Sequence, residues 1–192
     1  MSDLALFAYG SLVSPASAAA TLGREIEASP PLRLPGWRRR WSTFRDNLAS
    51  EKTFARADDG SLPPWCLGLN VEPAPDEAGP NGVLLYVTSD ELDRLDVREM
   101  RYDRTEVSSD FDGRPRDATV FTYTAKPRQH APEPPDGAVV IGSYVTAVER
   151  AFAALGDGEL QLYRETTDRP PVPVIDAVLV RDHIPEGNPR DW

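Results

Sequence analysis

The sequence predicts one α+β domain in which several short strands and a few helices enclose a small core. Nineteen prolines divide the 192-residue chain into short segments. Proline lacks an amide donor and fixes φ, so it interrupts both helices and strands. Most segments between the prolines are rich in apolar, β-branched and aromatic residues, as strands are. Apolar residues make up 40% of the chain, which is enough for a core at this length.

The strands are expected between the proline breaks. They are predicted at residues 4–8, 32–34, 37–44, 65–71, 82–87, 102–108 and 118–124. The first segment is wholly apolar and bounded by turn residues, which indicates a buried strand. Within 37–44, side chains alternate between the two faces, so Trp37, Arg39 and Trp41 are expected on the same face.

Helices are predicted at residues 15–20, 90–95, 140–155 and 159–165. Pro15 suits a first helical position because its φ is already helical. Ser89 is predicted to cap the second helix, with acidic residues next to its positive end. The third helix is the clearest, because Tyr144, Val148 and Phe152 form an apolar stripe at helical spacing. Gly156 is a natural stop for it.

Composition narrows the classes of partner. Lys and Arg number 21 and Asp and Glu number 31, which gives a formal net charge of −10 and argues against nucleic acid. No apolar run reaches the roughly 20 residues that cross a bilayer. The single cysteine, Cys66, excludes an intrachain disulfide, and an acid at Asp3 is unlike a signal peptide. The expected protein is cytoplasmic, with no membrane and no nucleic acid as partner.

Metal binding is not expected. Two distant histidines and one cysteine do not give a metal-ligand spacing. The chain also lacks a Walker loop and a dinucleotide-binding glycine pattern, so no cofactor is predicted.

The first candidate site is Tyr9-Gly10-Ser11-Leu12, where the first strand ends and a helix follows. Gly10 allows a sharp turn and leaves the neighbouring amides uncovered. Successive amides that point into one concavity bind an anion or a developing oxyanion. The alternative is an ordinary strand-to-helix turn that needs a glycine, and four residues alone favour it.

The second candidate site is Glu99, which lies between a predicted helix and a predicted strand. A carboxylate at such a junction can project into a pocket and serve as a general base, because partial desolvation raises the pKa of a carboxyl group. The alternative is a solvated loop in which Arg98 and Arg101 pair with Asp96 and Asp103.

Together these segments resemble a known family. The Tyr9–Leu12 loop is followed by Leu95-Asp96-Val97-Arg98-Glu99-Met100-Arg101-Tyr102-Asp103-Arg104, then by Gly142-Ser143-Tyr144-Val145 and Leu162-Tyr163-Arg164. This order is similar to the γ-glutamylcyclotransferase/AIG2-like family over roughly residues 4–165. Residues 1–165 are therefore expected to form that domain, with 166–192 as a C-terminal extension packed on it.

The resemblance implies a small mixed β-barrel with a few peripheral helices and a pocket at its mouth. Enzymes of the family release 5-oxoproline from small γ-glutamyl amines or peptides by attack of the α-amine on the γ-carbonyl. By resemblance, Glu99 is the catalytic base, and Gly10, Ser11 and Leu12 offer main-chain amides. Tyr9 lines the floor and Tyr144 contacts the substrate. The alternative is a non-catalytic small-molecule binding domain on the same scaffold.

Three departures from the family pattern concern the pocket. Met100 stands where family enzymes commonly have glycine, and could narrow the mouth. The proline-rich loops 73–81 and 127–135 are long enough to cover it.

The basic and aromatic run Trp37–Trp41 is interpreted as a strand whose arginine stems lie over the sheet. Its alternatives are a single-strand nucleic-acid face, or an arginine that binds a carboxylate of the substrate.

Overall fold

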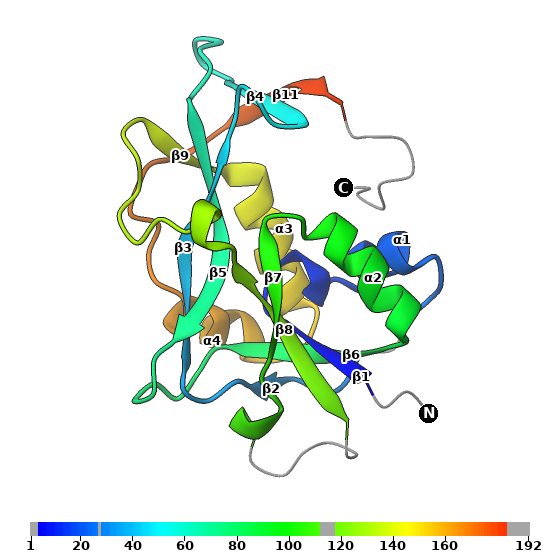
Figure 1. Cartoon of the computed structure of the whole chain (residues 1–192). Helices are drawn as coiled ribbons and strands as arrows, with labels where there is room; N and C mark the ends of the chain where they lie inside the picture. The colour runs from blue at the N-terminus through cyan, green and yellow to red at the C-terminus, as the bar shows by residue number, and fades with distance from the viewer. Residues whose placement is uncertain (1–3, 27, 112–117, 184–192) are drawn as a thin grey trace.

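The computed structural model describes residues 4–26, 28–111 and 118–183. It confirms the α+β class (Figure 1). The strands are β1 (Leu4–Ala8), β2 (Leu32–Arg33), β3 (Trp37–Asp46), β4 (Lys52–Arg56), β5 (Trp65–Pro73), β6 (Asn81–Val87), β7 (Tyr102–Glu106), β8 (Thr119–Ala125), β9 (Ala138–Ile141), β10 (Val174–Ile175) and β11 (Ala177–Asp182). The helices are α1 (Pro15–Leu22), α2 (Ser89–Arg98), α3 (Gly142–Ala153) and α4 (Glu159–Glu165).

The larger sheet is mixed and has the strand order β2-β6-β1-β8-β7. Its central strand β1 runs antiparallel to β6 and parallel to β8, so Leu6 lies opposite both Leu85 and Phe121. Ala5, Leu6 and Phe7 are almost fully buried. The apolar first segment is therefore the centre of this sheet, as a strand covered on both faces should be.

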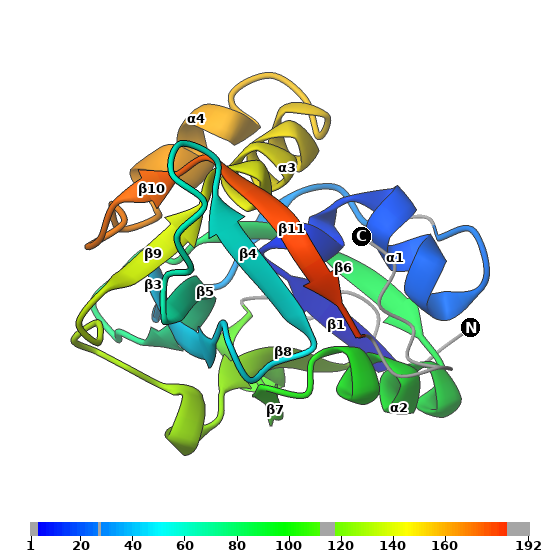
Figure 2. The ribbon, with the colours of Figure 1, turned by 90° about the horizontal axis from the view of Figure 1, so that it is seen from above.

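The second sheet has the order β10-β9-β5-β3, and a two-stranded ribbon joins β4 to β11. β9 pairs in parallel with both β5 and β10. β11 pairs antiparallel with β4, and the two strands lie side by side in Figure 2. The chain beyond residue 165 thus adds one strand to the second sheet and one to the ribbon.

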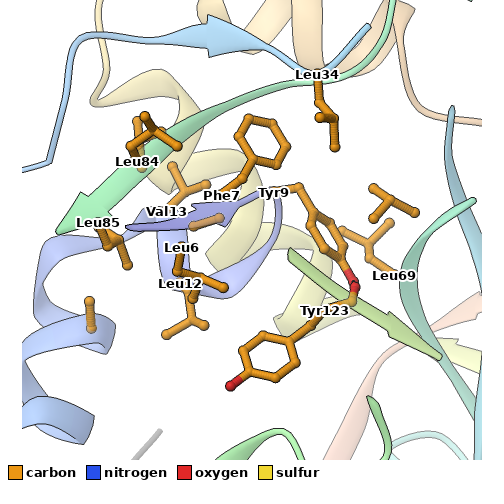
Figure 3. Close-up of a cluster of buried hydrophobic side chains, with 14 of the residues drawn as sticks. Leu6, Phe7, Tyr9, Leu12, Val13, Leu34, Leu69, Leu84, Leu85 and Tyr123 are labelled. Atoms are coloured by element: carbon orange, nitrogen blue, oxygen red, sulfur yellow. The ribbon is translucent and has the colours of Figure 1, made fainter. Parts of the chain in front are cut away.

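The core lies between the two larger sheets and the helices. Figure 3 shows part of it, with Tyr9, Leu69 and Tyr123 drawn together from β5, β8 and the segment after β1. The Ala125 amide of β8 donates to Asn70 Oδ1 of β5 over 2.8 Å, which ties the sheets together at one end. Within the described ranges the ladders form three sheets, and their closure into a barrel stays a prediction.

Two helix starts differ from the expectation. α2 is capped by Thr88 rather than Ser89, in a capping box whose reciprocal partner is Glu91. α3 begins at Gly142 rather than residue 140, because Val140 and Ile141 belong to β9. Tertiary pairing of this segment with β5 and β10 overrides its helical pattern. α1 packs against α2, and α3 packs against α4.

No helix among residues 4–26, 28–111 and 118–183 is both long and apolar enough to cross a bilayer.

Candidate functional site

The Tyr9–Leu12 loop follows β1 and turns through a short 3-10 helix, Ser11–Val13. The Val13 amide donates to the Gly10 carbonyl over 3.0 Å. Because the first amides of any helical turn have no acceptor within it, the turn leaves the Ser11 and Leu12 amides to other partners. The loop therefore presents the main-chain amides of Ser11 and Leu12 as hydrogen-bond donors.

Tyr9 is anchored at both ends of the residue. Its hydroxyl donates to the Tyr123 carbonyl over 2.7 Å, and the two side chains lie close together in Figure 3. Its carbonyl accepts from Arg39 Nη1 over 2.9 Å. Burial is the main reason that the pKa of the Tyr9 phenol is raised well above its ordinary value, so the group stays neutral and donates. The backbone that leads into Gly10 is thus fixed by two hydrogen bonds from distant elements.

Arg39 is fully buried at 0% exposure and lies on the inward face of β3 with Trp37 and Trp41, as their alternation predicted. Its guanidinium donates to the Tyr9 and Asn81 carbonyls and packs over the rings of Phe152 and Tyr163. Burial lowers its pKa to about 9, so it remains charged at neutral pH. This arginine holds the loop from inside the core.

Glu99 follows the last residue of α2. Its amide donates to the Leu95 carbonyl and its carbonyl accepts from the Tyr102 amide, each over 2.7 Å. These bonds fix the junction between α2 and β7, where the sequence predicted it. The Glu99 side chain is 17% exposed, and its carboxylate accepts from Arg98 Nε over 3.1 Å.

Arg98 links the two predicted segments. Its side chain is 2% exposed, and its Nη2 donates to Ser11 Oγ over 3.4 Å while its Nε contacts Glu99. Ser17 and Thr21 of α1 accept further hydrogen bonds from the same guanidinium. The alternative of a solvated loop, in which Arg98 pairs with a nearby aspartate, does not fit this buried arginine, because α1 and Glu99 accept from its donors.

The same alternative paired Arg101 with a nearby aspartate, but Arg101 has another partner. Arg101 forms a two-pronged pair with Glu51, with its nitrogens 3.0 and 2.6 Å from the two carboxylate oxygens. Asp96 instead contacts Arg104 and accepts from the Tyr123 hydroxyl over 2.6 Å. The partner of Arg101 lies fifty residues away and the tyrosine that contacts Asp96 lies 27 residues away, so local spacing does not reveal these two contacts.

A cavity of about 40 Å³ brings all the predicted site residues together. Its lining includes Tyr9, Gly10, Ser11, Leu12, Glu99 and Tyr144, along with Leu6, Phe7, Ala8, Leu69, Tyr102 and Tyr123. Segments some ninety positions apart thus place a carboxylate side chain and a main-chain loop around the same space.

A second cavity of about 130 Å³ shares part of this lining. Ser11, Glu99, Tyr102 and Tyr144 line both cavities. The rest of the larger lining is Thr43, Phe44, Arg45, Glu51, Lys52, Phe54, Cys66, Leu67, Gly68, Arg98, Arg101, Ile141 and Ser143. Glu99 is therefore one of the residues that the two cavities share.

Tyr144 comes from the first turn of α3 and packs edge-on against Trp41, with ring centroids 6.1 Å apart. A Cβ atom built on Gly10 would lie 3.5 Å from the Tyr144 hydroxyl oxygen. Glycine at position 10 thus keeps the space between the loop and this hydroxyl clear. Burial chiefly raises the pKa of Tyr144 well above its usual value.

The departures from the family pattern do not narrow these cavities. Met100 lines neither of them; its side chain is 46% exposed and faces a separate surface depression. No residue of the loops 73–81 and 127–135 lines either cavity. Sequence reasoning missed Arg98, Tyr102 and the whole larger cavity. The sequence shows that Arg98 is next to Glu99, but it does not show that the Arg98 side chain is buried against α1.

The described part of the chain contains no group of three or more His, Cys, Asp or Glu side chains that could hold a metal ion.

Fold and site together define an α+β domain with one carboxylate beside a main-chain loop in a shared cavity. The family model "Gamma-glutamyl cyclotransferase, AIG2-like" matches residues 6–146, well over half of the chain. The chain therefore belongs to the AIG2-like γ-glutamyl cyclotransferase family.

Solved structures show the same fold at low sequence identity. A structure titled "Gamma-glutamyl cyclotransferase" superposes with a TM-score of 0.56 and 14% identity over 87% of this chain and 88% of that one. An uncharacterized protein from Homo sapiens gives 0.54 and 15% over 87% and 88%. YkqA from Bacillus subtilis gives 0.54 and 16% over 84% of this chain but 53% of its own. This chain thus spans about half the length of YkqA. No curated protein matches the chain.

Proposed function

We propose that this protein is a γ-glutamyl cyclotransferase that releases 5-oxoproline from a small γ-glutamyl amine or peptide. One observation carries the proposal: Glu99 and the Gly10-Ser11-Leu12 segment line the same small cavity. A base and a set of oxyanion donors are the two groups that intramolecular attack on an amide carbonyl requires. Membership of the family supports the same reaction.

In the proposed mechanism, Glu99 removes a proton from the substrate α-ammonium. The free amine then attacks the γ-carbonyl carbon, a carbon–nitrogen bond forms, and the carbonyl oxygen becomes an oxyanion. Amides of the Gly10–Leu12 loop donate to that oxygen, and each such donor contributes roughly 3 kcal/mol. Collapse breaks the bond to the original amide nitrogen, which takes the proton back from Glu99 and leaves as an amine. The ring nitrogen, cationic after the attack, gives its extra proton to that amine, so the products are the neutral lactam and an ammonium ion. Because nucleophile and electrophile share one molecule, positioning supplies much of the rate.

The Arg98 contact suits this role. It holds the Glu99 carboxylate toward the loop, because the same guanidinium donates to Ser11 Oγ.

The Glu99→Gln variant tests the proposal. Glutamine retains a hydrogen-bond acceptor for Arg98 but cannot act as a base, so turnover is expected to fall by about 10²-fold or more with the fold intact. The assay is 5-oxoproline release from a panel of γ-glutamyl amino acids, γ-glutamyl amines and glutathione. Asp93→Asn is the matched control, because Asp93 is an exposed acid of the preceding helix α2, with 71% side-chain exposure.

Product formation by Glu99→Gln at the wild-type rate would remove Glu99 from the chemistry. Absence of product from the whole panel with wild-type protein would remove the enzymatic function.

A second candidate function is binding of a γ-glutamyl compound without turnover. The ion pair between Arg98 and Glu99 favours it, since Arg98 Nε occupies one oxygen of the carboxylate that would accept the substrate proton. Thermal stabilisation by a panel member without product formation would identify this function.

A further inference from the structure

The position of the Glu99 carboxylate depends on the short turn that carries it. Glu99 is the residue at which α2 ends, and the turn from Glu99 to Tyr102 leads into β7. The Tyr102 amide closes this turn by donating to the Glu99 carbonyl over 2.7 Å. Helix ends fray when no other contact holds them. An anchor outside α2 therefore determines how precisely the carboxylate is placed.

Arg101 ties this turn to the connection between β3 and β4. Two of its nitrogens lie 3.0 and 2.6 Å from the two carboxylate oxygens of Glu51. The two side chains are only 13% and 11% exposed, so salt screens the pair little. A two-pronged contact fixes the orientation of the guanidinium as well as its position. The Lys126 amide holds the backbone of the same residue, since it donates to the Arg101 carbonyl over 3.0 Å.

Glu51 is itself braced by β11. The His183 amide, directly after that strand, donates to the Glu51 carbonyl over 2.7 Å. The Arg181 guanidinium donates to the Leu48 carbonyl in the same connection and, over 3.0 Å, to Thr53 Oγ1 of β4. β11 lies beyond the segment that the family model matches. The brace behind Glu51 is therefore made by the C-terminal part of this chain.

The pair lies at the edge of the larger cavity. Glu51 and Arg101 line both this cavity and the surface depression beside Met100, and among the described residues no others line both. Glu99 and Tyr102, at the two ends of the turn, also line the larger cavity. In Figure 2 the start of β4 lies beside the connection between α2 and β7. Movement of the pair would therefore move the turn that carries Glu99 relative to the cavity.

We propose that Arg101 is a positioning residue for Glu99, and that Glu51, braced by β11, is its anchor. The inference rests on the proposed function, in which Glu99 removes a proton from the substrate α-ammonium. A base must lie within about 3 Å of the proton donor, and a misplacement of about 1 Å can lower the rate by about 10²-fold. The pair holds the turn and the turn holds the carboxylate, so neither Arg101 nor Glu51 needs to contact the substrate.

A double-mutant cycle tests the pair with Arg101→Met, Glu51→Gln and the two changes together. Each single change is expected to lower kcat for 5-oxoproline release by about tenfold or more, with KM changed less than about threefold. The double variant is expected to be no slower than the single variants, because either change already breaks the pair. Arg101→Lys keeps the charge without the two-pronged contact and is expected to recover only part of the rate.

Arg164→Met is the matched control. Arg164 forms a similar two-pronged pair with Glu149, over 2.8 and 3.0 Å, and neither residue lines either of the two cavities beside Glu99. Its kcat is expected to stay within about twofold of the wild-type value, because the pair is exposed and remote from the turn.

Hydrogen exchange of the Tyr102 amide, measured by NMR, reports on the turn without any turnover. This amide donates to the Glu99 carbonyl, so it exchanges faster when the turn opens. The reference is the Leu6 amide in the central strand β1. In Arg101→Met and in Glu51→Gln, exchange at Tyr102 is expected to become about tenfold faster relative to exchange at Leu6. Equal acceleration of both amides would instead indicate a general loss of stability.

The outcomes separate the proposal from its alternatives. A lower kcat together with faster exchange at Tyr102 supports it. A KM that rises in Arg101→Met but not in Glu51→Gln would show that the guanidinium contacts the substrate, which overturns the positioning role. Wild-type kcat in both single variants, or equal acceleration at Tyr102 and Leu6, overturns it as well.

Failure of the proposed function gives a different result. No 5-oxoproline from the wild-type protein overturns the cyclotransferase function. Exchange at Tyr102 then decides alone: faster exchange in the two single variants supports the anchor, and unchanged exchange overturns it.

Discussion

Replacing Arg39 by methionine tests how the core holds the candidate site. The guanidinium donates to the Tyr9 carbonyl, the Asn81 carbonyl and Asn81 Oδ1 over 2.8–2.9 Å, and to the hydroxyls of Thr166 and Thr167. Both hydroxyls also bond to carbonyls of α4, so they retain partners without Arg39. Methionine fills most of the volume but leaves the three oxygens of Tyr9 and Asn81 without this donor.

The expected loss follows from two opposing effects. Each buried acceptor left unsatisfied costs about 1–3 kcal/mol. Removal of a buried charge offsets part of this, because its desolvation is unfavourable. Three such acceptors cost about 3–9 kcal/mol before this offset, so the net loss of unfolding free energy is expected to be about 3–5 kcal/mol. For a chain of this size that lowers Tm by roughly 6–20 °C.

The assay is urea denaturation of Arg39→Met beside Arg38→Met. Arg38 is the adjacent residue on the outer face of β3, its side chain is 41% exposed, and it pairs with Asp168. Exposed pairs contribute little, so Arg38→Met is expected to lose less than about 1 kcal/mol. The two variants unfolding within about 1 kcal/mol of each other would refute the reasoning, since desolvation would then cancel every contact that Arg39 makes.

Two further predictions concern the loop and α2. In Gly10→Ala, the new Cβ would make ordinary contacts with Tyr144 and Leu69, so unfolding free energy should change by less than about 1 kcal/mol. It occupies the small cavity, so kcat/KM for 5-oxoproline release should fall by about tenfold or more; unchanged kinetics would place the substrate elsewhere. The hydrogen bond from Arg24 chiefly lowers the pKa of Glu91. Its stabilising contribution is therefore present above the unfolded value near pH 4.3 and is lost as pH falls through the lower folded value. Urea titrations should show Glu91→Gln about 0.5–1 kcal/mol less stable at pH 7, with the difference vanishing near pH 3; a constant difference would exclude the charge.

Local pattern was sufficient for much of the fold. The strand at residues 4–8 and the helix at 159–165 lie where the sequence predicted them. An apolar run predicts the strand, and glycines mark the boundary of the helix. Both signals lie within the segment itself, so no distant contact is needed to recognise them. β4, β9, β10 and β11 were missed or assigned otherwise. β10 has only two residues and β11 exposes most of its side chains, so pairing rather than propensity makes them strands.

For the candidate site, too, some features were predicted from local sequence and others depended on the tertiary structure. The sequence by itself predicted Tyr9–Leu12, Glu99 and Tyr144 as candidate site residues, since each lies in a short motif at a turn or an element end. Only the tertiary structure determined that these residues share a cavity and that a larger charged cavity adjoins it. It also determined that Arg39 lies inside the core, although its sequence context is that of an exposed basic run. The physical reason is that burial of a charge depends on acceptors from β6 and the segments around Tyr9 and Thr166, and no spacing within the chain specifies where those acceptors meet.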